Sequence, residues 1–150
     1  MQIRRAVPSE SDRLTAIARA AKAHWGYPAE WLDAWRDGLR ISAEEIERHA
    51  TFVAEENGDV VGVAQVQGDG TRFVLEHLWV DPQYHGRGAG RALVTHAREL
   101  AGGTLVIVAD ANAERFYLRC GAKRVGDVAA PMPGAPQRSL PLLELDAVVS

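Results

Sequence analysis

Apolar residues recur along this chain with two different periods, and each period predicts one kind of element. Spacing of three and four residues, from Leu14 to Ala21 and again from Ala89 to Leu100, predicts helices with one buried face. Runs rich in β-branched residues predict strands. The expected strands are 2–6, 51–55, 60–66, 72–80, 104–109, 123–128 and 139–145. The expected helices are one that opens with a capping box of Ser9 and Asp12, then 29–39, a short turn opened by Ser42 and Glu45, 87–100 and 112–119.

Turn residues indicate how these strands connect. Asn57-Gly58 between two strands is a strong hairpin signal, so 51–55 and 60–66 should pair antiparallel. The run 104–109 is apolar throughout and lies between two helices, which favours a buried strand parallel to 72–80. We therefore expect one domain over 1–150, of mixed α/β (α+β) class, with a central mixed sheet of six to seven strands and about four helices.

The segment after the strand 72–80 carries the most chemical information. Three glycines alternate where the next helix begins, and two arginines flank them: Gly86, Gly88, Gly90, Arg87 and Arg91. Glycine has no Cβ to keep an anion from the backbone, and a helix N-terminus presents unpaired N–H groups and the positive end of its dipole. The segment therefore predicts a phosphate-binding turn.

Residue spacing excludes two common nucleotide-binding turns. A dinucleotide fingerprint, Gly-x-Gly-x-x-Gly, needs a last glycine where this chain has Arg91 or Leu93. A Walker A loop ends in Lys followed by Ser or Thr, and the equivalent residues here are Arg91 and Ala92. The turn is therefore of another type.

The turn resembles the pyrophosphate loop of the GNAT superfamily of acyl-CoA-dependent N-acetyltransferases. Gln83, Gly86 and Gly88 match its signature of Gln or Arg, two residues, Gly, one residue, then Gly or Ala. The preceding Leu78-Trp-Val80-Asp-Pro82 resembles the strand ending that leads into that loop. The resemblance implies the GNAT fold, in which the two central parallel strands splay apart to admit the pantetheine arm of acetyl-CoA.

A second segment, 110–122, resembles the other recurring motif of the family, Asn-x-x-Ala-x-x-Phe-Tyr-x-x-x-Gly-Phe. It departs from that motif at Asp110 and Ala122, which stand where Asn and Phe are usual, and Asn112 could take over the role of the amide. The residues that the resemblance assigns to acetyl-CoA are Leu78, Trp79, Val80, Gln83, His85, Gly86, Arg87, Gly88, Ala89, Gly90, Arg91, Asn112 and Phe116.

Acetyl transfer to an amine needs a base for the incoming ammonium, donors for the carbonyl oxygen and an acid for the leaving thiolate. Alternation along the strand 72–80 gives one face with Val74, Glu76, Leu78 and Val80, and another with His77 and Trp79. Family enzymes often draw the base from the face of the Leu and Val, so Glu76 is the first candidate, directly or through a water. His77 is the reserve, and a structural ion pair is the alternative role for Glu76.

The resemblance gives Tyr117 as the acid, because the phenol in the family's Phe-Tyr position commonly lies close to the sulfur. A phenol also stays protonated at neutral pH. A tyrosine that only packs in the core is the alternative. A backbone amide near Val80 is expected to stabilise the carbonyl oxygen.

Aromatic residues gather in the region that forms the acceptor pocket in GNAT enzymes. Trp25, Tyr27 and Trp31 are the expected acceptor-binding residues. An aromatic pocket can hold a cation, and Glu30 or Asp33 could pair with an amine. The same spacing also fits packing in the core, so the acceptor is left open.

Composition narrows the functional classes. Apolar residues make up 47% and charged residues 25% of the chain, as in ordinary globular proteins. The formal charge of −3 argues against a nucleic-acid partner. No signal peptide or membrane-length apolar stretch is present, so we expect a cytoplasmic protein without membrane contact. The single Cys120 has no neighbour in sequence that would activate it as a nucleophile. The five histidines lack the spacing of metal ligands, so no metal is expected.

These observations favour an N-acetyltransferase that moves an acetyl group from acetyl-CoA to a primary amine of a small molecule or amino acid. Two other functions stay open, namely an acyl-CoA-binding module without turnover and an acetyltransferase of protein N-termini or lysines. Tyr117 and Glu76 favour the enzyme, and the aromatic segment favours a closed pocket for a small acceptor. A homodimer is expected only because dimers are common in this fold.

Overall fold

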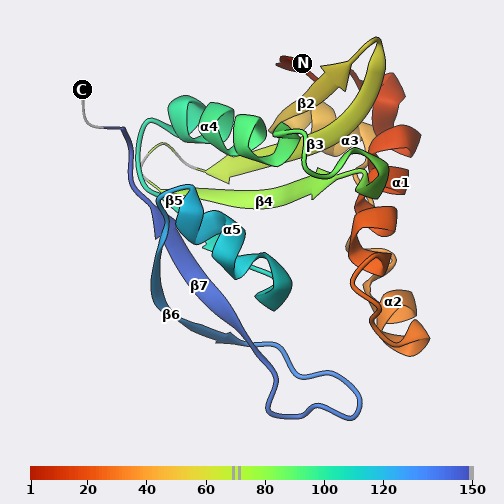
Figure 1. Ribbon diagram of the computed structural model, residues 1–150, viewed down its shortest axis with the longest axis vertical. Coiled ribbons are helices and arrows are strands. Elements are labelled where there is room, and N and C mark those ends of the chain that lie inside the picture. Colours follow the sequence, from red (N-terminus) through yellow and green to blue (C-terminus); the bar gives the residue numbers. More distant parts are fainter. Residues whose placement is uncertain (69, 71, 149–150) are drawn as a thin grey trace.

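The computed structural model describes residues 1–68, 70 and 72–148. One seven-stranded sheet runs through the molecule in the order β1-β2-β3-β4-β5-β7-β6 (Figure 1). Its strands are β1 (Gln2–Arg5), β2 (Ala50–Glu56), β3 (Asp59–Gly68), β4 (Phe73–Val80), β5 (Leu105–Val108), β6 (Lys123–Ala129) and β7 (Ser139–Leu145). Neighbouring strands are antiparallel except β4 and β5, which are parallel. The predicted mixed sheet is confirmed.

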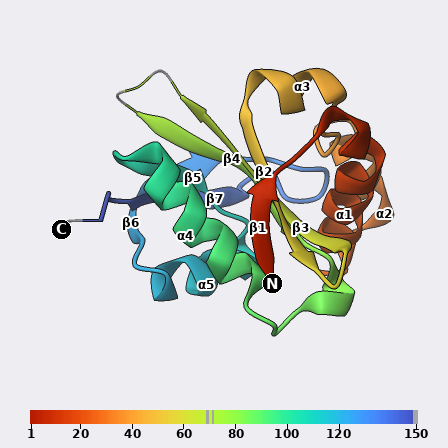
Figure 2. The same ribbon diagram turned by 90° about the horizontal axis from the view of Figure 1, so that it is seen from above.

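Helices cover both faces of this sheet (Figure 2). They are α1 (Ser11–Ala23), α2 (Ala29–Trp35), α3 (Ala43–Arg48), α4 (Ala89–Ala101) and α5 (Glu114–Arg119). On one face, α4 and α5 bury Leu93 and Tyr117 in an apolar cluster. On the other, α1 and α3 bury Leu14 and Ile46 in a second cluster. The sheet therefore lies between two cores, because its strands turn alternate side chains to opposite faces.

The β2–β3 hairpin forms at the predicted dipeptide. Asn57 and Gly58 have positive φ angles of 53° and 85°, as a two-residue turn of type I′ requires. The two strands pair antiparallel, as predicted. The strand β3 extends to Gly68, two residues beyond its predicted end at 66. Of the segment expected to connect it to the next strand, residues 69 and 71 lie outside the described residues.

A bulge interrupts β4 at Glu76. On β3, Gln65 pairs with His77 while the adjacent Val66 pairs with Leu75, so Glu76 has no partner in the ladder. An extra residue of this kind shifts the alternation of side chains along the strand that carries it.

The shift changes which residues of β4 face α4. Leu75 joins the apolar cluster beneath α4, whereas strict alternation predicted Val74 there, and that part of the prediction is wrong. His77 and Trp79 lie on the opposite face, toward α1 and α3, as predicted.

The parallel pairing of β4 with β5 is short. It joins Phe73 to Leu105 and Val74 to Val106, and no further pair of described residues links the two strands. From Leu75 to Val80, the edge of β4 that faces β5 therefore has no strand partner. This is the expected splay, and it opens the sheet next to the start of α4.

The predicted start of the first helix needs correction. The expected capping box of Ser9 and Asp12 is wrong, because Pro8 starts a 3-10 turn in front of α1. Within that turn the Glu10 carboxylate accepts a hydrogen bond from the Val7 amide at 2.9 Å. The capping carboxylate thus comes from Glu10, and the amide that it satisfies is that of Val7.

Two other helices differ in detail from the prediction, and one cap agrees with it. The helix expected over 29–39 ends at Trp35. Leu100 is exposed, because Ala101 takes the inward position on the last turn of α4. The side chain of Ser42 accepts a hydrogen bond from the amide of Glu45 at 3.1 Å, so the predicted cap of α3 is confirmed.

Candidate active site

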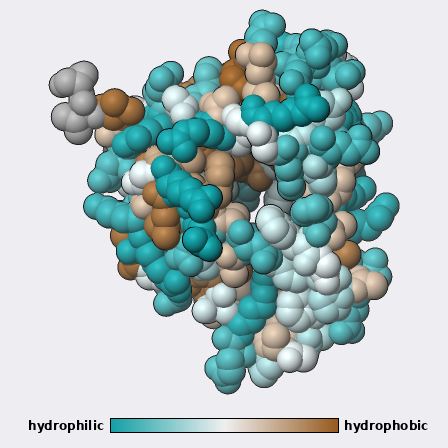
Figure 3. All heavy atoms as spheres, in the orientation of Figure 1, coloured by the Kyte–Doolittle hydropathy of each residue, from teal (hydrophilic) through white to brown (hydrophobic). Residues whose placement is uncertain are grey.

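A cleft of about 420 Å³ opens where β4 leaves β5. Figure 3 shows this face of the molecule hollowed near its centre, with apolar residues inside and hydrophilic residues around them. The predicted site residues that line the cleft are Trp25, Glu76, Leu78, Trp79, Val80, His85, Gly86, Gly88, Ala89, Gly90, Arg91, Asn112, Phe116 and Tyr117. One cavity thus brings together both predicted catalytic residues and most predicted cofactor contacts.

Four predicted site residues lie outside this lining: Gln83, Arg87, Tyr27 and Trp31. The Nη1 atom of Arg87 lies 3.2 Å from Oε1 of Glu56, and its guanidinium lies over the ring of Tyr84. The backbone amide of Gln83 donates to the side chain of Asp81 at 3.0 Å. The side chain of Arg87 is therefore held by Glu56, which lies outside the cleft lining, and by Tyr84, which belongs to it.

The turn before α4 presents free donors to the cleft. Within the described chain, the backbone N–H groups from Gly88 to Arg91 donate no hydrogen bond, and the amide of Ala92 makes the first helical bond. No acidic residue occupies the first turn of α4.

The backbone of this turn is also open to a ligand. Gly86 and Gly88 have φ angles of 79° and 85°, a conformation that favours glycine. Among the described residues, no heavy atom from elsewhere in the chain lies within 4 Å of the place that a Cβ would take at either glycine. Together with the free amides, this space fits a phosphate group.

Gly90 has a different role from the other two glycines. A Cβ at Gly90 would lie 3.1 Å from Cζ of Phe116, which is tighter than an ordinary contact. Gly90 therefore allows the ring of Phe116 to rest on the first turn of α4. This packing role was not predicted from the sequence, and Gly90 also lines the cleft.

Tyr117 places a phenol in the wall of the cleft. Its side chain is 7% exposed, and its ring packs edge-on against Phe116. No hydrogen bond joins its hydroxyl to any described residue. Burial raises the pKa of Tyr117, and the charges of Cys120 and Asp110 raise it further. The hydroxyl is therefore protonated and free to donate to a group in the cleft.

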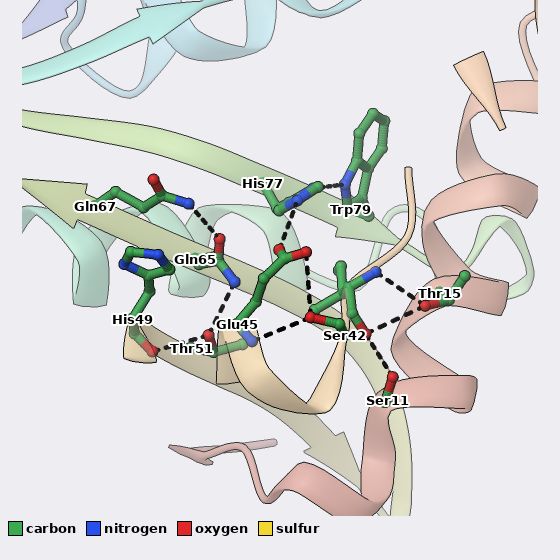
Figure 4. Close-up of polar contacts among 11 residues, drawn as sticks. Ser11, Thr15, Ser42, Glu45, His49, Thr51, Gln65, Gln67, His77 and Trp79 are labelled. Carbon is green, nitrogen blue, oxygen red and sulfur yellow. Dashed lines mark hydrogen bonds and ion pairs between the residues drawn. The ribbon is translucent and has the colours of Figure 1, made fainter. Parts of the chain in front are cut away.

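Glu76 and His77 are neighbours in sequence but lie in different environments. Glu76 is exposed and lines the cleft. His77 is 6% exposed, and its Nδ1 atom accepts a hydrogen bond from Nε1 of Trp79 at 2.9 Å (Figure 4). Its Nε2 atom lies 3.9 Å from Oε2 of Glu45 on α3.

These contacts determine the charge and the tautomer of His77. Burial lowers the pKa of His77, although the charges of Glu45 and Glu76 oppose this. Because Nδ1 accepts a hydrogen bond, the proton of the neutral ring is on Nε2. His77, the second candidate for the base, is thus turned toward α3 and is not among the residues that line the cleft.

A polar cluster, consisting of Lys22, Tyr27, Asp110 and Asn112, lies at the end of β5. Nζ of Lys22 lies 2.7 Å from Oδ2 of Asp110, and the hydroxyl of Tyr27 donates to the same carboxylate at 2.8 Å. Asn112 donates its backbone amide to Asp110 at 2.8 Å and its side-chain amide to the Tyr27 hydroxyl at 3.0 Å. Asp110 and Asn112 also line the cleft.

Asp110 is ionised in this polar cluster. Burial alone would raise the pKa of Asp110, but hydrogen bonds from Lys22 and from the Asn112 amide more than offset this and hold the pKa below its ordinary value. This polar cluster was not predicted from the sequence. Its only signal was an Asp where the family motif has Asn.

Tyr27, Trp31 and Trp35 form an aromatic cluster, and the chain itself supplies the cations on their faces. The rings of Tyr27 and Trp31 stack at 5.9 Å, and Trp35 lies edge-on to both. Nζ of Lys22 lies 4.3 Å from the centroid of Trp35, and the guanidinium of Arg138 lies 5.1 Å from it. Among the predicted acceptor residues, Trp25 alone lines the cleft.

Other chemistry is limited within the described ranges. Cys120 is half-buried, and burial raises the pKa of its thiol, as expected of a packing role. No group of three or more His, Cys, Asp and Glu side chains in these ranges could hold a metal ion. None of their helices is long and apolar enough to cross a membrane.

Several solved structures share this fold. A GCN5-related N-acetyltransferase from Rhodopseudomonas palustris matches with a TM-score of 0.81 at 23% identity, over 97% of this chain and 94% of that one. The PaiA N-acetyltransferase from Thermoplasma acidophilum, in complex with coenzyme A, gives 0.74 at 17% identity, over 97% and 98%. The yncA protein from Salmonella typhimurium, with its cofactor acetyl-CoA, gives 0.72 at 21% identity, over 100% and 95%.

Sequence comparison gives the family. No curated protein matches this chain. The acetyltransferase (GNAT) domain family matches residues 47–121, which is half of the chain. That half contains β4, the glycine turn, α4, β5 and most of the cleft lining. The chain therefore belongs to the GNAT superfamily of N-acetyltransferases.

Proposed function

We propose that this enzyme transfers the acetyl group of acetyl-CoA to a primary amine of a small molecule. The observation that carries the proposal is one cleft that joins the free amides at the start of α4 to the hydroxyl of Tyr117 and the carboxylate of Glu76. Two proteins of the same fold, PaiA and yncA, are complexed with coenzyme A and acetyl-CoA. The proposal takes residues 1–150 as one catalytic domain.

The residues of the cleft fit acetyl-CoA at two places. The amides from Gly88 to Arg91 and the open backbone at Gly86 would hold the pyrophosphate, with the Arg91 side chain adding positive charge. The edge of β4 from Leu78 to Val80 has no strand partner on the side of β5, so its backbone can pair with the amides of the pantetheine arm. The side chain of Arg87 pairs with Glu56 and is left out of this assignment.

Acetyl-CoA supplies an acetyl thioester, whose C–S bond breaks as a C–N bond forms to the amine. Glu76 takes the proton that the incoming ammonium must lose, directly or through a water. Tyr117, whose phenol lines the cleft, donates its proton to the departing sulfur and is restored by the second proton that the nitrogen loses as the amide forms. A backbone amide on the free edge of β4 near Val80 would donate to the carbonyl oxygen.

A small acceptor is supported by how the loop between β6 and β7 lies against α2. Nε1 of Trp31 donates to the carbonyl oxygen of Pro133 in that loop at 2.9 Å. This contact ties the loop to the helix that carries Trp31, one of the expected acceptor-binding residues, whereas acetylation of a protein segment needs an open groove.

The purified chain should be mixed with acetyl-CoA and a panel of primary amines, amino acids and peptides, with release of thiol as the measurement. We expect release with a small amine, and at least about a tenfold lower kcat/KM for Glu76→Gln at neutral pH. Glu47→Gln, an exposed change on α3, is the matched control. Acetyl-CoA binding without release by any amine would overturn the proposal in favour of a binding module. Release with peptides alone would overturn it in favour of protein acetylation.

A further inference from the structure

The loop between β6 and β7, residues 130–138, brings a cation to the aromatic cluster. Figures 1 and 2 both show this loop beside α2, and the hydrogen bond from Trp31 to Pro133 holds it there. The guanidinium carbon of Arg138, at the end of the loop, lies between 5.1 and 5.9 Å from the three ring centroids of the aromatic cluster.

Two cations meet at this cluster, and only one of them has a counterion. Lys22 pairs with Asp110, and both side chains are 11% exposed. No carboxylate in the described part of the chain lies within ion-pair distance of Arg138. The region therefore has one uncompensated positive charge.

The guanidinium of Arg138 also keeps donors to spare. Its Nη1 atom donates to the carbonyl oxygen of Ala130 at 3.2 Å, out of five N–H groups that a guanidinium carries. Aromatic faces attract a cation without neutralising it. Arg138 is thus fixed in place while it retains both charge and donors for an anion.

Tyr27 links Arg138 to two residues of the cleft lining. The hydroxyl of Tyr27 bonds to Asp110 and Asn112, which line the cleft, and the face of the same ring meets Arg138. Burial, followed by the Asp110 carboxylate, raises the pKa of Tyr27, and Arg138 opposes that shift. The guanidinium therefore acts on a side chain that is hydrogen-bonded to two residues of the cleft lining.

We propose that Arg138 binds a carboxylate of the acceptor, so that the substrate is an amine that also carries a carboxylate. This inference rests on the proposed function, since it names the class of acceptor for the same site. The planar fork of a guanidinium pairs with both oxygens of a carboxylate. Because the aromatic cluster already orders Arg138, binding costs little further side-chain entropy.

The position of Tyr27 also bears on the shape of this acceptor. Neither Tyr27 nor Arg138 is among the residues that line the cleft, whereas Glu76 and Tyr117 are. The amine and the carboxylate are therefore at different ends of the molecule, as in an ω-amino carboxylate.

A purely structural role for Arg138 makes a different prediction. A clamp that only holds the loop on α2 would affect all acceptors alike, whatever their charge. A carboxylate site would affect only acceptors that carry the charge. Each ω-amino carboxylate has a neutral amide of the same length, and this pair separates the two roles.

The test uses the full chain, acetyl-CoA, and the series glycine, β-alanine, 4-aminobutyrate and 6-aminohexanoate with their amides. We expect a longer member of the series to react best. Arg138→Gln should lower its kcat/KM about ten- to a hundredfold and should change that of its amide by less than about twofold. Arg138→Lys keeps the positive charge but not the planar guanidinium. Its kcat/KM for the carboxylate acceptor should lie between those of the wild type and Arg138→Gln. Arg40→Gln, an exposed change after α2, is the matched control.

If Arg138→Gln lowered kcat/KM equally for the carboxylates and for their amides, the proposal would be overturned. A higher kcat/KM for the amides than for the carboxylates in the wild type would also overturn it. Binding gives a second readout that does not depend on turnover. With coenzyme A present, the carboxylates should change the fluorescence of Trp31 and Trp35 in the wild type and not in Arg138→Gln. Such binding without acetylation would contradict the proposed function while supporting the carboxylate site. Fluorescence changes that are the same in both proteins would contradict the carboxylate site alone.

Discussion

The ammonium nitrogen of Lys22 lies 2.7 Å from a carboxylate oxygen of Asp110 and so joins the end of α1 to the end of β5. Asp110→Asn would leave Lys22 largely buried without its counterion. We expect the free energy of unfolding, measured with urea, to fall by about 1–3 kcal/mol. Asp146→Asn removes an exposed pair with Lys123 and should cost less than about 1 kcal/mol. Equal losses in the two variants would contradict a special role for the Lys22–Asp110 pair.

The same pair predicts a dependence of stability on pH. The folded-state pKa of Asp110 lies below its ordinary value of 3.8, so the unfolded chain binds the proton more readily. The contribution of Asp110 is therefore complete above pH 3.8 and is lost as the pH falls through the lower pKa of the folded state. The difference in stability between wild type and Asp110→Asn should be constant from pH 7 to pH 5 and shrink below pH 3.8. A difference that grows on acidification would contradict this assignment.

Tyr117→Phe tests the proposed acid. The ring and its contact with Phe116 are kept, while the only proton donor on this side chain is removed. We expect kcat to fall at least about tenfold, with acetyl-CoA affinity by calorimetry within about twofold of wild type. Tyr84→Phe, which removes a phenol from another part of the cleft lining, is the control. An unchanged rate under conditions where chemistry limits turnover would remove Tyr117 from the mechanism.

Alanine substitutions of two glycines at opposite ends of α4 distinguish an effect on ligand binding from an effect of backbone strain. Gly88 and Gly102 have φ angles of 85° and 64°. Among the described residues, no heavy atom from elsewhere in the chain lies within 4 Å of the place that a Cβ would take at either glycine. Alanine at either residue should therefore lower the free energy of unfolding by about 1 kcal/mol. We expect Gly88→Ala alone to weaken acetyl-CoA binding, measured by calorimetry. Equal affinities in the two variants would place the pyrophosphate elsewhere.

His77 predicts a second change of stability with pH. Its folded-state pKa is lowered below the ordinary value of 6.5, so below pH 6.5 the unfolded chain takes up the proton first. Stability should fall as the pH decreases from 6.5 toward the folded-state pKa, by up to about 1.4 kcal/mol per pH unit. His77→Gln should lack this contribution, whereas His49→Gln should keep it. If the free energy of unfolding changed with pH in the same way in wild type and His77→Gln, His77 would not be the source of this pH dependence.

Local sequence signals predicted the parts of the fold that depend on neighbouring residues. Asn57-Gly58 specified its hairpin because two positive φ angles suit few other dipeptides. The glycine turn was located for the same reason, since Gly86 and Gly88 adopt backbone conformations that other residues avoid.

Features that depend on distant residues were not predicted. The bulge at Glu76 is a property of how β4 pairs with β3, and periodicity within one strand assumes regular pairing. Lys22 and Asp110 are 88 residues apart in sequence, so no local pattern connects them. Arg138 reaches the aromatic cluster only because the loop between β6 and β7 folds back onto α2.

The short ladder between β4 and β5 has a consequence for folding as well as for catalysis. The chain leaves one edge of β4 unpaired inside its own sheet, so a ligand that hydrogen-bonds along this edge takes the place of a missing strand. Any such ligand binds only the folded chain and shifts the unfolding equilibrium by mass action. The cofactor is then a structural component of the sheet, and the melting temperature of the protein reports its concentration.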